Sequence, residues 1–432
     1  MKTQFQWGNG VKYSSNFQFL NVLALRHEEP ILATYNVEDG PQPLIERQLH
    51  TFWIILFALI ASFWIFYGLR GVIGLLHLPS LKDFSPAAGE NLPRISMVFA
   101  ARDEQEKLPF AVQTLSTLSY RNLEIIAVDD RSQDKTPAIL DDAARSDSRL
   151  RVIHVKELPE GWLGKPHALQ KAYEASTGEW LLFTDADVRF APDALARAMT
   201  LVQTRRLDHL TLLFDVDRDG FWETVLLAFF GLAMHLANES HHVSNPNSRA
   251  YLGVGAFQLV RRSAYEACGT HKRLAMEVVD DMKLGKILKL GGYRSCVGTG
   301  VGFLAVRWQS GFGNLIRGVT KNFFAGVGYS IPLATLAIVA MLLTNFAPFV
   351  GVIFGHGWVR ILAGISVAVA LLFHVLVDLG AKISPLYALT HPIGALIFCW
   401  MLLRSMIVTL RQGGVIWRDT FYKLADLKKG VV

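Results

Sequence analysis

The sequence predicts an α/β fold in which a doubly wound, mostly parallel sheet is joined to membrane-spanning helices. Between residues 94 and 183, short apolar runs of strand length alternate with helical patterns. Strands that alternate with helices favour a parallel sheet with helices on both faces. The composition is the second observation, because 51% of the 432 residues are hydrophobic and only 19% are charged. This apolar share is high for a soluble protein, and the length allows one domain plus several spans.

Four strands are expected, and polar residues follow each of them. Their ranges are 94–100, 123–128, 150–155 and 180–183. Apolar residues at positions 108, 112, 115 and 118 predict a helix after the first strand. Asp134 and Pro137 are typical of a helix start after the second strand, and the helix after the third is expected to reach Ala175. Ligands of such sheets bind at the carboxyl ends of the strands, so the polar residues there are candidates for a site.

Asp185 and Asp187 are the most informative pair, because they follow the apolar strand Trp180–Phe183 directly. In an extended chain, side chains two residues apart share one face. Two carboxylates at the end of a buried strand need a partner for their charge. Such hard oxygen ligands suit Mg²⁺ or Mn²⁺, particularly when substrate phosphates complete the coordination. Taken alone, the pair has an alternative interpretation as a turn that binds no metal.

The order of the polar segments resembles that of inverting family 2 glycosyltransferases, which have the GT-A fold. The matching segments are Ala100–Glu104, VDDRSQDKT from Val128, GWLGKPHAL from Gly161, TDADV from Thr184, Tyr251–Arg262 and Val279–Gly285. The resemblance implies a GT-A domain over residues 94–325 that takes a sugar from a nucleoside-diphosphate sugar. The GWLGKPHAL and DADVRFAPDAL segments are most similar to membrane enzymes that glycosylate lipids, including the hopanoid-associated and ceramide types.

The resemblance also implies which residues surround the nucleoside of the donor. Ala100, Arg102 and Glu104 would lie around the base and the ribose. One of Asp129 and Asp130 would accept a hydrogen bond from the nucleobase. Uracil has an imide N–H that suits such a carboxylate, and guanine also fits. Of the two, a UDP-sugar is the favoured donor.

Three residues are expected at the diphosphate. Lys165, directly after a glycine, would be a point charge near the diphosphate, although a solvated helix start is the alternative for this lysine. By the resemblance, Asp187 is the expected direct ligand of Mg²⁺ or Mn²⁺. Asp185 would bind the ribose or support the metal.

An inverting transferase needs a base that takes the proton of the acceptor hydroxyl. Asp281 aligns with the base of the family, and Asp280 precedes it where the family more often has Glu. The two neighbours therefore leave an ambiguity of one position. Both carboxylates also suit the start of a helix, where the macrodipole favours negative charge.

The acceptor side is expected around Gly255, Phe257, Arg307 and Trp308. The first two lie in the glycine-rich segment that resembles the acceptor-side strand of the family. Arg307 and Trp308 resemble the end of its Q-x-x-R-W signature, in which the Trp bounds the acceptor pocket. The first position of that signature is Leu304 here, which argues against a processive polysaccharide synthase.

Four membrane spans are predicted by apolar runs of spanning length. The first is residues 51–69, preceded by an N-terminal tail of residues 1–50, and three more occupy 331–355, 359–379 and 386–410. A basic tail, residues 411–432, follows this C-terminal membrane domain of residues 331–410. Pro332, Pro348 and Pro392 allow the alternative that one of these stretches is a re-entrant or interfacial segment.

Nucleotide sugars are cytosolic, so we expect a multi-pass protein of the cell membrane with a cytoplasmic catalytic domain. Arg70 and Lys82 follow the first span and agree with the positive-inside rule. The basic tail also favours the cytosol, yet three spans after a cytosolic domain would place it outside. Residues 221–237 form a further apolar helix, which fits either the membrane interface beside the acceptor or an ordinary core.

The net charge of +6 is best explained by anionic lipid headgroups, because no nucleic-acid-binding motif is found. Three widely spaced cysteines, with no C-x-x-C pair, indicate neither a disulfide framework nor a zinc site. The favoured function is the transfer of one sugar to a lipid acceptor at the cytosolic face. A processive polysaccharide synthase and a scaffold on a decayed transferase fold are the alternatives.

Overall fold

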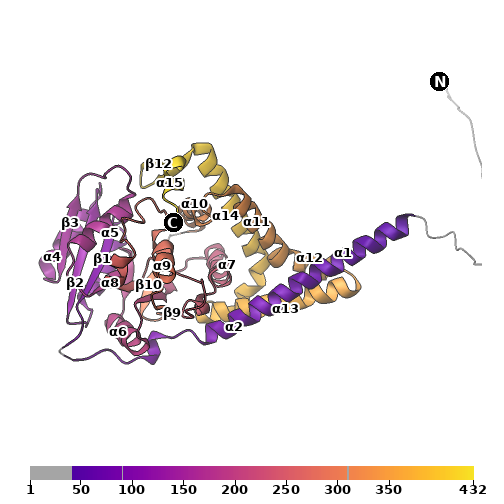
Figure 1. Ribbon diagram of the computed structural model, residues 1–432, viewed down its shortest axis with the longest axis horizontal. Coiled ribbons are helices and arrows are strands. Elements are labelled where there is room, and N and C mark those ends of the chain that lie inside the picture. Colours follow the sequence, from indigo (N-terminus) through magenta and orange to yellow (C-terminus); the bar gives the residue numbers. More distant parts are fainter. Residues whose placement is uncertain (1–40, 90, 309–310) are drawn as a thin grey trace, which may run out of the picture. The chain divides into compact units, whose positions relative to one another are not determined.

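The computed structural model describes residues 41–89, 91–308 and 311–432, with the backbone alone for 41–43 (Figure 1). Most of the predicted N-terminal tail, residues 1–40, lies outside this range. Thr51–Val432 forms one compact unit, and the description below concerns that unit.

A seven-stranded sheet in the order β3-β2-β1-β4-β8-β6-β9 forms the centre of the unit. Strands β1 to β4 are parallel to one another, β8 is antiparallel to both of its neighbours, and β9 is parallel to β6. The mostly parallel α/β sheet expected from the sequence is therefore confirmed. The strands are β1 Ile95–Ala101, β2 Leu123–Asp130, β3 Leu150–Val155, β4 Trp180–Phe183, β6 His209–Leu213, β8 Gln258–Arg261 and β9 Ser295–Thr299.

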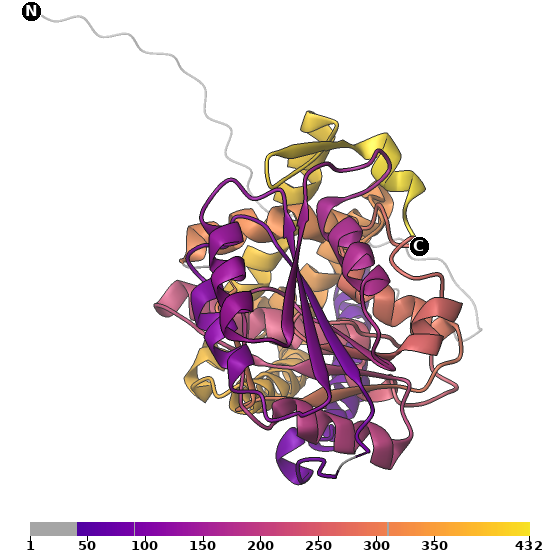
Figure 2. The ribbon, with the colours of Figure 1, turned by 90° about the vertical axis from the view of Figure 1, so that its left-hand side faces the viewer.

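Helices cover both faces of this sheet (Figure 2). The side chains of β1 alternate between the two cores, since Met97 and Phe99 pack on one face and Val98 on the other. The first face is covered by α3 Leu108–Ser116, α4 Thr136–Ser146 and α6 Ala194–Arg205. The second is covered by α5 Gly164–Glu174, α8 Arg262–Ala267 and α9 Asp280–Leu290.

A small second sheet in the order β5-β10-β7 fixes two predicted segments next to each other. It consists of β5 Val188–Phe190, β7 Asp215–Val216 and β10 Leu304–Val306. Val188 pairs with Val306 across the antiparallel β5 and β10 strands. Because Asp187 precedes β5 and Arg307–Trp308 follows β10, the pairing brings the acidic pair and the Trp side by side.

In the described part of the chain, five helices are long and apolar enough to cross a membrane. Four of them contain the four predicted spans, and the fifth is α7, Phe221–Asn238. The first begins ahead of the predicted residue 51, because α1 spans Pro41–Phe63. It continues through the π-helix Trp64–Gly68 into α2 Leu69–Leu76. The others are Ile331–Phe354 (α11 Ile331–Met341, a π-helical turn and α12 Ala347–Phe354), α13 Gly357–Gly380, and Pro385–Gln412, which contains α14 His391–Gln412.

Prolines at 332, 348 and 392 begin helices here, because each occupies the first or second position of α11, α12 or α14. The missing N–H of a proline costs little at that position. The alternative of a re-entrant segment therefore receives no support from these three residues.

The predicted basic tail is folded. After α14 the chain forms a hairpin of β11 Gly414–Trp417 and β12 Thr420–Lys423, followed by α15 Leu424–Lys429. Leu427 is fully buried in a cluster with Phe324 of α10, Phe312–Gly326. These last residues therefore pack onto the rest of the unit (Figure 1).

Phe257, expected at the acceptor, is fully buried in the core of the main sheet. Phe257→Ala should lower the free energy of unfolding by about 3–5 kcal/mol, because it leaves a cavity in a packed core. Phe110→Ala is the matched control, since Phe110 is 65% exposed and should change the same quantity by about 0.5 kcal/mol or less. Equilibrium denaturation of the detergent-solubilised protein measures both. A loss below about 1 kcal/mol for Phe257→Ala would contradict a core role.

Candidate active site

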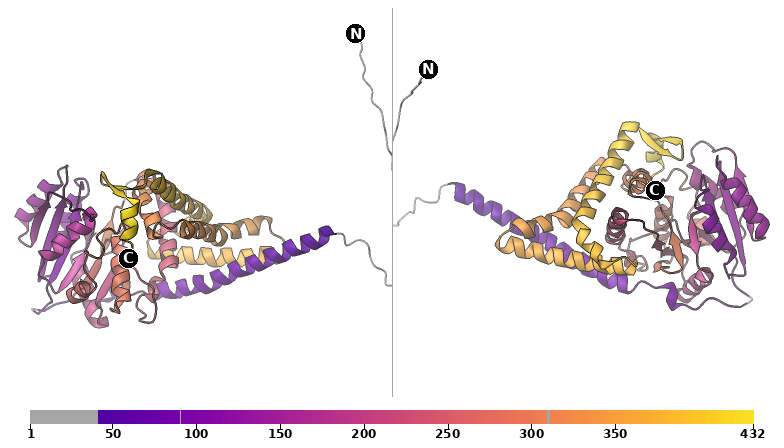
Figure 3. Two further views of the ribbon diagram at one scale, coloured as in Figure 1. Left: turned by 45° about the horizontal axis from the view of Figure 1, so that its top comes forward. Right: turned by 180° about the vertical axis from the view of Figure 1, so that it is seen from behind.

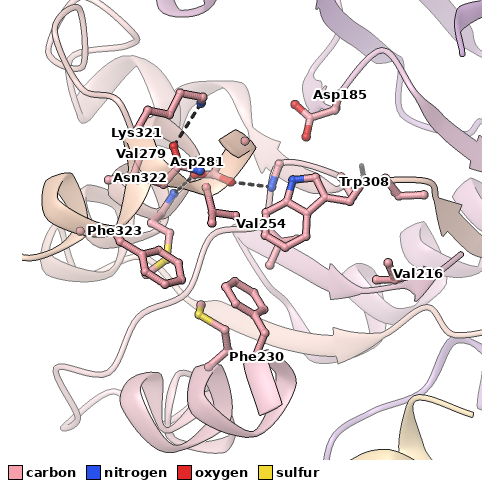
Figure 4. Close-up of a pocket in the computed structure, with 18 of the residues that line it drawn as sticks. Asp185, Val216, Phe230, Val254, Val279, Asp281, Trp308, Lys321, Asn322 and Phe323 are labelled. Carbon is pink, nitrogen blue, oxygen red and sulfur yellow. Dashed lines mark hydrogen bonds between the residues drawn. The ribbon is translucent and has the colours of Figure 1, made fainter. Parts of the chain in front are cut away.

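The carboxyl ends of the central strands open into one large cavity of ≈ 2190 Å³. Its lining comes from the strand-end loops, from α7, α10, α13 and α14, and from the β11–β12 hairpin. In Figure 4, Asp185 and Lys321 lie on the upper side of the cavity, Phe230 and Phe323 on the lower side, and the indole of Trp308 between them. The cavity therefore has a charged side and an apolar side.

Lysines neutralise both carboxylates of the acidic pair. The Nζ of Lys165 donates to Asp185 Oδ1 at 2.6 Å, and the Nζ of Lys107 donates to Asp187 Oδ2 at 3.0 Å. Lys107 also donates to the carbonyl of Trp308 at 2.8 Å. Burial, with the nearby Asp185 carboxylate, raises the pKa of Asp187, and Lys107 opposes this shift. The pair is thus a partly buried acidic site whose negative charge is balanced by two lysines.

The acidic pair suits Mg²⁺ or Mn²⁺, because both ions prefer carboxylate oxygens. Within residues 41–89, 91–308 and 311–432, no group of three or more His, Cys, Asp or Glu side chains is arranged to hold a metal ion. Among these described residues, Asp185 and Asp187 are the carboxylates available to such an ion, and phosphates or water would complete its coordination. A site with open positions of this kind is usual for Mg²⁺ that binds together with a phosphate-bearing substrate.

Lys165 lies in the first turn of α5, where the alternative interpretation placed a solvated lysine. Its side chain lines the cavity. Burial opposes its charge, but the carboxylates of Asp185, Asp280 and Asp281 raise the pKa of Lys165 well above its usual range. The preceding residue must be small, because a Cβ on Gly164 would collide with the carboxylate of Asp130. Lys165 is thus a permanent positive charge at the centre of the acidic cluster.

Asp280 and Asp281 occupy the first turn of α9, and both line the cavity. The Oδ2 of Asp281 accepts a hydrogen bond from the N–H of Gly255 at 2.9 Å (Figure 4). Asp280 Oδ2 lies 3.9 Å from the Nε2 of His271. Burial raises the pKa of both aspartates, and Lys165 opposes it. Their placement fits a proton acceptor at either position.

Gly255 lets the acceptor-side segment approach the acidic pair closely. A Cβ at this position would lie 2.5 Å from Asp185 Oδ2. The N–H of the same residue donates to Asp281, so Gly255 lies between the expected metal site and the expected base. Only glycine fits there without a shift of the backbone or of Asp185.

The residues expected around the nucleoside fall into two groups. Those that line the cavity are Ala100, Arg102, Glu104 and Asp130. The Asp129 carboxylate instead accepts from the N–H of Ser132 at 3.2 Å and contacts His154 Nδ1 at 3.0 Å, outside the cavity lining. Of the two aspartates that the sequence leaves as alternatives, Asp130 is the one at the cavity.

Acceptor-side residues are divided in the same way. Trp308 and Gly255 line the cavity, and the Trp308 ring packs edge-on against Phe230 of α7 with centroids 5.1 Å apart. Phe257 lies in the core, as described above. The Arg307 guanidinium lies 3.7 Å from Asp219 and is not among the described lining residues. The predicted roles of Phe257 and Arg307 thus receive no support from their positions.

Lys321 is a residue that the sequence did not single out. It lies on α10, donates to Asn322 Oδ1 at 3.1 Å, and stacks over the Trp417 ring at 3.9 Å. Burial, with the nearby Lys165 charge, lowers the pKa of Lys321 to about 8, although the neighbouring carboxylates oppose this shift. The only signal in the sequence is a lysine within an amphipathic helix that immediately precedes a span.

Comparisons with known proteins indicate the family and the enzyme class. Residues 96–269 match the family described as Glycosyl transferase family 2. A 4,4'-diaponeurosporenoate glycosyltransferase of Staphylococcus haemolyticus is 26% identical over 268 residues, which are 61% of this chain and 70% of that protein. A beta-monoglucosyldiacylglycerol synthase of Trichormus variabilis is 28% identical over 214 residues, 47% of this chain and 44% of that protein.

A solved structure shares the fold. It is the mannosyltransferase PcManGT from Pyrobaculum calidifontis in complex with GDP-Man and Mn²⁺, with a TM-score of 0.52 and 19% identity. The likeness covers 84% of this chain and 98% of that one, and it shows a GT-A-like mixed α/β fold around a central sheet. Residues 96–269 thus match a family 2 glycosyltransferase domain, and the protein is a glycosyltransferase.

Proposed function

We propose that the protein transfers a sugar from a nucleoside-diphosphate sugar to a membrane lipid, with inversion at the sugar carbon and with Mg²⁺ or Mn²⁺. The observation that carries the proposal is the single cavity in which strand-end carboxylates and apolar helices face each other. A charged donor and an apolar acceptor fit its two sides.

The charged side supports the chemistry of transfer. Asp187, with Asp185, would hold Mg²⁺ or Mn²⁺, which when bound neutralises charge on the leaving nucleoside diphosphate. Lys165 adds a fixed positive charge beside the same group. Asp281 takes the proton of the acceptor hydroxyl. The hydroxyl oxygen forms the new bond to the sugar carbon while the bond from that carbon to the diphosphate breaks.

The apolar side supports a lipid acceptor. Phe230 and Met234 of α7, Val377 of α13 and Phe398 of α14 all line it. Trp308 separates this side from the acidic pair (Figure 4). One relative has a diacylglycerol in its name, which fits an acceptor of this class. A UDP-sugar is the favoured donor, as the sequence suggested.

Membrane topology is part of the same proposal. Helices α12 and α13 pack side by side in opposite directions, because only two residues separate them, and α13 runs beside the first helix (Figure 3). The segments Ile331–Phe354 and α13 would cross and return. Helix α14 packs on α10, α7 and α11, and we infer that it does not cross, so that the hairpin after it stays on the cytoplasmic side with the catalytic domain.

This topology removes the conflict that the basic tail created. Arg418 of the hairpin pairs with Glu104, in the loop after β1. A contact between the last segment and the nucleotide-binding domain requires an even number of crossings between them. We therefore infer two crossings after residue 330, with α14 at the inner boundary of the membrane.

Asp187→Ala should lower transfer more than about 100-fold, because the charge on the leaving diphosphate loses its main compensation. Asp142→Ala, at an exposed carboxylate of α4, is the matched control and should leave the rate unchanged. Nucleotide release is measured with and without added Mg²⁺ or Mn²⁺. Full turnover in excess chelator would show that no divalent cation is required.

Asp281→Asn should leave donor binding intact and lower the chemical rate by roughly 10²–10⁴-fold, the usual contribution of a general base. Asp280→Asn should do much less. The base acts only when it is deprotonated, and burial raises the pKa of Asp281. As the pH is lowered, activity should therefore be lost at a pH higher than the ordinary aspartate pKa of about 4. Single-turnover rates across pH measure both effects. The opposite order of the two variants would assign the base to Asp280.

Trp308→Ala should impair transfer to a lipid acceptor far more than hydrolysis of the donor by water, by about tenfold or more. The reason is that the Trp308 ring borders the apolar side of the cavity, where it packs against Phe230. Trp358→Ala, at a 63% exposed Trp outside the cavity lining, is the control. Equal loss of both activities, or products longer than one sugar, would favour the processive synthase instead.

A further inference from the structure

The β11–β12 hairpin reaches back over the charged side of the cavity. At its tip, the Arg418 guanidinium pairs with the carboxylate of Glu104 and donates to the carbonyl of Asp103 at 3.3 Å. Both partners lie in the loop after β1, more than 300 residues earlier in the chain. Arg418 and the neighbouring residues of the hairpin belong to the cavity lining.

The hairpin holds Arg418 in a fixed place. Trp417 pairs with Thr420, so Arg418 and Asp419 form a two-residue turn, and both have a left-handed backbone with φ of 47° and 61°. Two-residue hairpin turns of this conformation match the twist of their strands. The N–H of Leu424 closes the base of the hairpin by donating to the Gly413 carbonyl at 2.8 Å.

Contacts on several sides dock the hairpin on the domain. The Trp417 ring lies 3.9 Å beneath the ammonium of Lys321, and Tyr422 interacts with Arg131, the partner of Asp130. Beyond the hairpin, Lys283 of α9 donates to the carbonyl of Val432 at 2.7 Å. The hairpin is therefore a built wall of the cavity.

The balance of charges in the cavity indicates a role for Arg418 in binding an anion. Lys107 and Lys165 each hold one carboxylate of the acidic pair, whereas a nucleoside diphosphate brings at least two further negative charges into the same cavity. Arg418 uses two of its five N–H donors for Glu104 and Asp103, and its side chain is 40% exposed. The planar guanidinium fork matches the geometry of a phosphate.

We propose that Arg418 is a donor-binding residue, with its guanidinium binding a phosphate of the nucleoside-diphosphate sugar, and that Glu104 is the positioning residue that orients it. The β11–β12 hairpin then forms the outer wall of that site. This inference rests on the proposed function, because it requires a nucleotide donor in the cavity. It adds a donor-binding element that lies outside the matched family region, residues 96–269.

The test compares Arg418→Ala, Arg418→Gln and Arg418→Lys in the full chain, in detergent. Lys423→Ala is the matched control, because it removes one positive charge from the same hairpin at a side chain outside the cavity lining. UDP and GDP are the probes for binding by calorimetry. KM is measured separately for the donor and for a lipid acceptor, with and without a phosphate in its headgroup.

Arg418→Ala and Arg418→Gln should weaken binding of the preferred nucleotide roughly 10- to 100-fold, as expected for a lost hydrogen bond to a charged group. Arg418→Lys should recover part of this loss, because it keeps the charge without the fork. The donor KM should rise in parallel, while the acceptor KM stays within about twofold and Lys423→Ala behaves as wild type. This split supports the proposal, since a merely structural role would affect both KM values.

Nucleotide binding within about twofold of wild type in Arg418→Ala would overturn the inference and leave the proposed function intact. A rise confined to the KM of the phosphate-bearing acceptor would also overturn it, because the phosphate at Arg418 would then belong to the lipid. If Arg418→Ala does not fold, Arg418→Gln and Arg418→Lys decide by the same readouts. Wild-type protein that binds neither nucleotide and releases none from any donor would instead refute the proposed function.

Discussion

Charge balance inside one buried cavity is the constraint on which the rest of this structure depends. Among the carboxylates that line the cavity, six come from four segments of the sheet domain and face the expected donor and base positions, and each unpaired one would be costly to bury. They are Glu104, Asp130, Asp185, Asp187, Asp280 and Asp281. Lys107 and Lys165 come from the sheet domain, but Lys321 and Arg418 come from α10 and the β11–β12 hairpin. Helix α10 and the β11–β12 hairpin therefore add positive charges that help balance the carboxylates of the sheet domain.

This arrangement explains which parts of the site could be predicted from the sequence. Asp185, Asp187 and Lys165 follow strands or begin helices, and local patterns locate such positions well. Asp129 and Asp130 are adjacent and chemically identical, so only the pleat of β2 decides that Asp130 faces the cavity. Phe257 shows the same limit, because a residue beside a glycine-rich segment can point into the core as readily as into the site.

The hairpin was beyond sequence reasoning for a different reason. Its turn residues are Arg418 and Asp419, whereas the recognisable signal for such a turn is Asn-Gly or Asp-Gly. Its strands are four residues long and flanked by lysines and arginines, a composition that predicts a solvated tail. What fixes the fold is tertiary: Trp417 meets Lys321, and Arg418 meets Glu104, across very long sequence separations.

Helix α7 links the two sides of the cavity. The sequence allowed either a helix at the membrane interface or an ordinary core helix, and each interpretation describes part of it. Its first turn exposes Phe221 and Trp222, while Leu226, Phe229 and Leu232 are buried. Phe230, between these buried positions, packs on Trp308, which follows β10 beside the acidic pair. Lys107 holds the carbonyl of the same Trp and one carboxylate of that pair. Three successive contacts therefore connect Phe230 on the apolar side with Asp187 on the charged side of the cavity.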